Sequence, residues 1–268
     1  MLQVRGQLRD AADVLATDIR GAAVSRYGLP LMTDSALELF AGIGTSVVCT
    51  TPAGPALFLP PTALSSGTVL TSLLATPDTG DLALIYAMPG GIPDSGQWVE
   101  SRITAFASRS LSTSCPPSTG FTSAADAAAG RKGYVVTLGS ALTAVRKGAP
   151  VRFLRRARYS LYRSSDGSWY LGYRRCNATG PSVCSTIQPV SGPYLAYGSS
   201  GAATNGLAFR YFNAAGSELL DAALSATTAR VDIVLRGETV RAVALVGDAR
   251  VRYRDSAVVT ISPRNRSR

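Results

Sequence analysis

The stretch QLRDAADVLATDIRGA, residues 7–22, has the periodicity of an amphipathic helix. Its apolar side chains recur every three or four positions, which places them on one face of a helix. Charged residues fall mostly on the other faces, and Arg9 and Asp13 are spaced for an i,i+4 contact. We therefore expect a helix within residues 1–25 that docks on a globular body through Val4, Leu8, Leu15 and Ile19.

After Pro30 the pattern changes to short strands separated by turns. The 26 glycines and 15 prolines indicate many turns, and a charged fraction of only 16% is typical of a folded chain. No internal repeat or linker divides the sequence. The predicted fold class is α+β: an N-terminal amphipathic helix packed on a mostly antiparallel β-sheet body. We expect one domain over residues 1–268, with a β-rich head at 30–268.

Residues 151–175 predict a β-hairpin, because two aromatic-rich runs flank the turn sequence SSDG at 164–167. The alternation of residues along the two strands predicts one packed face of the hairpin and places arginines on the opposite face. The packed face would contain Phe153, Tyr159, Leu161, Trp169, Leu171 and Tyr173, and the arginines are Arg152, Arg156, Arg158 and Arg174. Such an arginine and tyrosine ribbon is a candidate binding site for DNA or another polyanion. The alternative, which we favour, is cross-strand aromatic packing beside solvated arginines.

Basic residues are concentrated in the second half of the chain. Residues 1–150 carry ten Lys or Arg and ten Asp or Glu, whereas residues 151–268 carry seventeen arginines and seven acids. The net charge of +10 therefore arises after residue 150. Codon bias and solubility explain such an excess, and a basic face for nucleic acid, acidic lipid or acidic polysaccharide is the alternative.

The chain contains no histidine, which excludes Ser-His-Asp triads, Cys-His pairs and His-ligated zinc. The acidic residues are scattered singly, and no calcium-binding loop, Walker loop or GxGxxG motif is present. We therefore expect no catalytic residues, no metal site, no cofactor and no enzymatic activity. A histidine-independent envelope hydrolase is the remote alternative.

Four cysteines are present, and none forms a CxxC pair. Cys176 and Cys184 enclose the turn-rich segment NATGPSV, which suits a short disulfide. Cys49 would then pair with Cys115, although four cysteines allow three connectivities. Disulfides indicate an oxidising, extracytoplasmic compartment, and buried free thiols are the alternative interpretation.

No stretch of the sequence reaches the roughly 18 apolar residues of a membrane span, and no signal peptide is visible. A disulfide-bonded chain needs a route out of the cytoplasm. We therefore expect that an upstream segment is missing, either because the chain was shortened or because its reading frame begins at an internal methionine.

Short motifs at both ends resemble type IV pilin-like proteins. Residues 7–22 are similar to the stretch that follows the membrane segment in minor pilins and type II secretion pseudopilins. The pattern Leu-x-Phe-x-Tyr-x-Asn-x-x-Gly at 207–216, the alternating strand at 231–235 and the Pro-Arg-Asn-Arg sequence at 263–266 resemble their C-terminal parts. The middle of the chain matches only weakly.

This resemblance implies a non-enzymatic filament subunit, a minor pilin or pseudopilin of a type IV pilus or type II secretion system. Its partners would be other pilin or pseudopilin subunits and the assembly machinery, reached through loops at 109–130 and 176–205. It would reside in the periplasm or at the cell surface, anchored in the inner membrane if the full-length form has the missing helix. The alternative is a pilin-like receptor that binds DNA or another polyanion through the arginine-rich hairpin.

Overall fold

The computed structural model describes residues 2–89, 96–198, 204–239, 241–244 and 250–264. The chain forms two compact units. Unit 1 comprises Met1–Ala41, Arg156–Cys176 and Val183–Arg268, and unit 2 comprises Gly42–Arg155 and Asn177–Ser182. The chain passes from one unit to the other within strands β2 and β8, so each of these strands contributes to both units, and it crosses again on either side of Asn177–Ser182. The division into two compact units does not test whether either unit folds alone. The expectation of one domain over residues 1–268 therefore stays a prediction.

Strands dominate the fold, and the expected pilin-like α+β arrangement was wrong. Strands account for 42% of the residues and helices for 18%, with one long helix at the N-terminus, so the fold is β-rich. Every strand pair of known register in the described part of the chain is antiparallel. The helical periodicity of residues 7–22 is not repeated later in the chain. Alternating apolar residues and frequent turns direct the remainder into strands that pair with one another.

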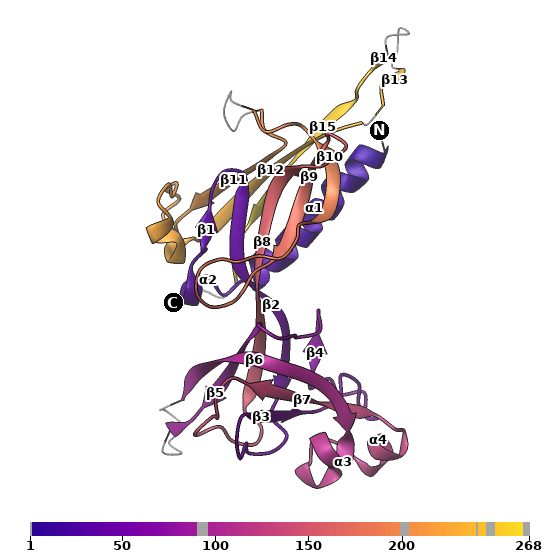
Figure 1. The fold of residues 1–268 in the computed structure, drawn as a ribbon, viewed down its shortest axis with the longest axis vertical. Helices are drawn as coiled ribbons and strands as arrows, with labels where there is room; N and C mark the ends of the chain where they lie inside the picture. The colour runs from indigo at the N-terminus through magenta and orange to yellow at the C-terminus, as the bar shows by residue number, and fades with distance from the viewer. Residues whose placement is uncertain (1, 90–95, 199–203, 240, 245–249, 265–268) are drawn as a thin grey trace. The chain divides into compact units, whose positions relative to one another are not determined.

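Unit 1 is an antiparallel sheet with one long helix packed on it (Figure 1). Strand order runs β11-β12-β10-β9-β8, and β15 pairs with β12 through eight consecutive residue pairs. The elements of unit 1, including its parts of β2 and β8, are α1 (Leu2–Gly21), α2 (Val24–Tyr27), β1 (Leu31–Met32), β2 (Ala36–Val47), β8 (Pro150–Arg163), β9 (Trp169–Arg175), β10 (Gln188–Tyr194), β11 (Leu207–Phe212), the 3-10 helix η4 (Ala222–Thr227), β12 (Arg230–Glu238), β13 (Val243–Ala244), β14 (Arg250–Val251) and β15 (Arg254–Ile261).

The predicted hairpin is confirmed for residues 157–175 in unit 1, whereas Phe153 of the expected packed face lies in the core of unit 2. β8 and β9 pair antiparallel, with Tyr159 opposite Tyr173 and Leu161 opposite Leu171. Gly167 closes the turn with a φ of 83°, a conformation that glycine adopts at little steric cost. Tyr159 and Leu171 are buried in the core that α1 covers, which also includes the fully buried Val231, Ile233 and Leu235 of β12.

Unit 2 contains the continuation of the same 13-stranded sheet and has a hydrophobic core of its own. The N-terminal part of β8 pairs with β5, and the order continues β5-β6-β7-β3. Its core contains Ile85, Ile103, Val136 and Phe153, all fully buried. The remaining elements of unit 2 are β3 (Ala56–Leu59), β4 (Ser72–Leu73), β5 (Leu82–Ala87), β6 (Gln97–Ser110), α3 (Leu111–Ser114), the 3-10 helix η3 (Pro117–Thr119), α4 (Ala124–Ala128) and β7 (Lys132–Leu138).

Candidate functional site: a docked helix and a buried carboxylate

The apolar stripe of α1 is buried along the whole helix. Val4, Leu8, Leu15 and Ile19 are each at most 4% exposed. The stripe packs on β10, β12 and β15, and burial of each large apolar side chain contributes about 1.5–3 kcal/mol. The structure therefore assembles all four residues of the expected docking face into one contact surface.

A glycine on β12 permits the close approach of the helix. A Cβ atom built on Gly237 would lie 3.0 Å from Val4 Cγ1 and 3.5 Å from Leu8 Cδ2. A side chain at this position would therefore press against the first two turns of α1. The sequence offered no sign of this role, because Gly237 and its two helix contacts are more than 200 residues apart.

Polar contacts hold α1 near both of its ends. Arg5 forms an ion pair with Asp255 of β15 at 2.9 Å. This contact holds the pKa of Asp255 below its usual range through the Arg5 hydrogen bond. Tyr194 of β10 donates its hydroxyl to the Gln7 carbonyl at 3.4 Å. Near the other end, the Tyr159 hydroxyl donates to Asp18 Oδ2 at 2.6 Å. These contacts restrain the sliding and the rotation of the helix on the sheet.

Glu38 of β2 is a fully buried carboxylate that two arginines of β8 neutralise. Arg156 Nε lies 2.5 Å from Oε1, and Arg158 Nε lies 2.7 Å from Oε2. The arginine side chains are themselves only 11% and 26% exposed. Sequence analysis missed this site, although a single acid between Leu37 and Leu39 on a predicted strand was a usable signal.

The four proposed polyanion-binding arginines do not form one exposed stripe. Arg156 and Arg158 contact Glu38, and Arg174 is the register partner of Arg158 across the hairpin. Arg152 belongs to unit 2, where its guanidinium lies 4.7 Å from the centroid of the Trp98 ring. The structure therefore brings together Arg156, Arg158 and Arg174 within unit 1, and two of these three have an acidic partner.

A disulfide closes the loop next to Glu38. Cys176 and Cys184 are bonded, and Cys176 Sγ lies 3.9 Å from Glu38 Oε2. The carboxylate and the two sulfurs lie within 4.8 Å of one another, a spacing that suits a metal ion. Because both sulfurs are joined to each other, they offer no thiolate ligand, and this group does not fit a metal in its oxidised form.

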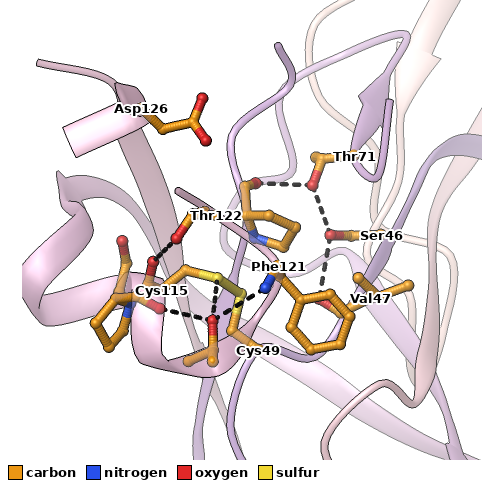
Figure 2. The surroundings of a disulfide bond; sticks show 12 residues. Ser46, Val47, Cys49, Thr71, Cys115, Phe121, Thr122 and Asp126 are labelled. Carbon is orange, nitrogen blue, oxygen red and sulfur yellow. Dashed lines mark hydrogen bonds between the residues drawn. A yellow bond between two sulfur atoms is a disulfide. The ribbon is translucent and has the colours of Figure 1, made fainter. Parts of the chain in front are cut away.

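The second disulfide joins Cys49 to Cys115 in unit 2 (Figure 2). Both cysteines are fully buried, and the Thr122 hydroxyl donates to the Cys115 carbonyl at 2.6 Å. These are the pairs that the spacing of the cysteines favoured. Two disulfides indicate an oxidising, extracytoplasmic environment.

The chain matches no family model, no curated protein and no solved structure. None of the described helices is both long enough and apolar enough to cross a membrane. Of the motifs that carried the pilin resemblance, Asn265 and Arg266 lie outside the described residues, as do residues 199–203 of the expected partner loop at 176–205.

Proposed function

We propose that the chain is a non-enzymatic structural subunit of a cell-envelope filament, of the minor pilin or type II secretion pseudopilin kind. The observation that carries the proposal is the docking of α1, which the sheet of unit 1 holds over its whole length. A filament transmits force between its core helices and its outer heads. It therefore needs each helix fixed rigidly to its head, and a buried stripe with polar contacts at both ends meets that need.

The proposal relies on the docked helix and on the oxidising compartment, and not on the fold class. We place the subunit in the periplasm or at the cell surface, where its partners are other filament subunits and their assembly machinery. Anchoring in the inner membrane is part of the proposal if an apolar segment precedes α1 in the full-length protein.

The test is the recovery of the tagged protein from filaments sheared off the cells that make it. We expect the protein in the filament fraction, and we expect deletion of its gene to reduce filament number or filament-dependent secretion. Recovery of the protein only outside filaments, together with normal filaments and secretion in the deletion strain, would overturn the proposal.

Two variants of α1 test the contribution of the docked face. Leu15 is fully buried, whereas the neighbouring Val14 is 39% exposed. Leu15→Asp should abolish incorporation into filaments, and Val14→Asp should leave it unchanged. Equal incorporation of both variants would show that the docked face has no role in assembly.

Polyanion binding through the hairpin stays a prediction. The ion pairs of Arg156 and Arg158 with Glu38 give both guanidinium groups a structural role, which weakens this alternative. Affinity for duplex DNA that falls steeply with salt, and that falls further in Arg174→Ala, would support it. Absence of binding to DNA at low salt would remove it.

A further inference from the structure

One end of the unit 1 sheet contains a pocket of about 450 Å³. The turn of the β8–β9 hairpin forms one wall, the ends of β10 and β12 form another, and Arg252 contributes from the segment before β15. This volume lies within the range of roughly 300–1,000 Å³ that is typical of small-molecule sites. The pocket does not include Glu38, and it shares Tyr194 with the contacts that hold α1.

Trp169 is one of the residues that line the pocket. It is the first residue of β9, lies opposite Arg163 of β8 and Tyr194 of β10, and is half-buried. An indole offers a broad, flat apolar surface with a negative electrostatic face. Such a surface suits the polarised C–H groups on one face of a sugar ring.

Polar groups held by hydrogen bonds line the same pocket. Asp166 accepts hydrogen bonds from the Ser168 backbone N–H at 2.9 Å and from the Tyr170 hydroxyl at 3.0 Å. Arg252 Nη1 donates to Glu238 Oε1 at 3.0 Å, and the Arg252 side chain remains 57% exposed. A carboxylate oxygen accepts more than one hydrogen bond, and a guanidinium carries five N–H donors. The pocket thus presents both acceptors and donors, as the hydroxyl groups of a sugar require.

The residues that line the pocket carry two acidic groups and one basic group, in contrast to the excess of +10 over the whole chain. The acids are Asp166 and Glu238, and the base is Arg252, which pairs with Glu238 at 3.0 Å. A pocket with more acidic than basic groups does not select an anion. We propose that this pocket binds a neutral saccharide, stacked on Trp169 and hydrogen-bonded by Asp166 and Arg252.

The experiment is saturation-transfer NMR on the intact protein with named sugars as probes: D-glucose, D-galactose, D-mannose, N-acetyl-D-glucosamine and D-glucuronate. We expect saturable binding of at least one neutral sugar with a millimolar dissociation constant. Trp169→Ala should weaken that binding about tenfold or more. Arg252→Ala, which changes an exposed side chain, should weaken it as well. Trp98→Ala changes the other tryptophan, which lies in unit 2, and should leave binding unchanged.

Three outcomes would overturn the proposal. The first is absence of saturable binding by any neutral sugar up to 50 mM. The second is stronger binding of glucuronate than of glucose. The third is an unchanged affinity for the sugar in both Arg252→Ala and Trp169→Ala. If circular dichroism shows that Trp169→Ala is unfolded, an unchanged affinity in Arg252→Ala alone has the same consequence.

Discussion

The hydroxyl of Tyr159, on β8, donates a 2.6 Å hydrogen bond to Asp18, on α1, across 141 residues of sequence. Tyr159 is 2% exposed and Asp18 is half-buried, so this bond joins the hairpin to the helix at the edge of the unit 1 core. Burial, followed by the nearby Asp18 charge, raises the pKa of the Tyr159 phenol. The phenol therefore remains a donor through the neutral and mildly alkaline range.

Replacing Tyr159 with Phe removes this donor and leaves the Asp18 carboxylate without it. We expect a loss of about 1–3 kcal/mol in the free energy of unfolding, measured by urea denaturation at pH 7. Tyr170→Phe is the matched control, because its bond to Asp166 lies at the surface and its loss should cost less than about 0.5 kcal/mol. Equal losses in the two variants would contradict a special role for the Tyr159–Asp18 bond.

The buried tyrosines predict a loss of stability in alkali. Burial raises the pKa of Tyr194 to about 12, and burial also raises the pKa of Tyr211. An unfolded tyrosine titrates near pH 10, so above that pH the unfolded chain releases protons that the folded chain retains. This contribution to stability is complete below pH 10 and is lost as the pH rises towards the folded pKa.

Between pH 9 and pH 11 we expect the free energy of unfolding to fall by about 1.3 kcal/mol from Tyr194 alone. Chemical denaturation at the two pH values measures this difference. The fall should be smaller in Tyr194→Phe than in the wild type. A free energy of unfolding that does not change between the two pH values would refute the prediction.

Glu38 is expected to be the most sensitive single ion-pair position. Glu38→Gln keeps the shape of the side chain but leaves Arg156 and Arg158 without a buried negative charge, which should cost about 3–5 kcal/mol. Glu218→Gln is the matched control, because its ion pair with Arg210 is largely exposed and should be worth less than about 1 kcal/mol. Urea denaturation of both variants measures the difference. If Glu38→Gln lowers the free energy of unfolding as little as Glu218→Gln does, the buried ion pairs of Glu38 contribute little to stability.

The two disulfides should contribute unequally to stability. The Cys49–Cys115 bond spans 66 residues and the Cys176–Cys184 bond spans 8. Restriction of the unfolded chain predicts losses of about 4 kcal/mol for the double Cys→Ser variant at Cys49 and Cys115, and of about 2.5 kcal/mol for the double variant at Cys176 and Cys184. Thermal and urea denaturation of the double variants measure both losses. The opposite order would show that packing next to Glu38 outweighs loop length.

Local sequence patterns predicted much of the secondary structure. The stripe from Val4 to Ile19 predicted α1, and Asp166-Gly167 with its flanking aromatic residues predicted the hairpin and its turn. Both signals arise between residues a few positions apart, where helical or strand periodicity and turn chemistry act directly. The predicted α+β fold class was wrong. The helix at the start of the chain is clear in the sequence, but it does not determine how the later strands pair into a sheet.

The sequence by itself determined which faces are apolar, where the chain turns and which cysteines could form a short loop. Only the tertiary structure decided that the chain forms two units, that Glu38 is buried, and that Trp169 lines a pocket with Arg252. The physical reason is distance along the chain: the arginines that neutralise Glu38 lie 118 and 120 residues away. Burial of a charge depends on such long-range contacts, and residue periodicity carries no information about them.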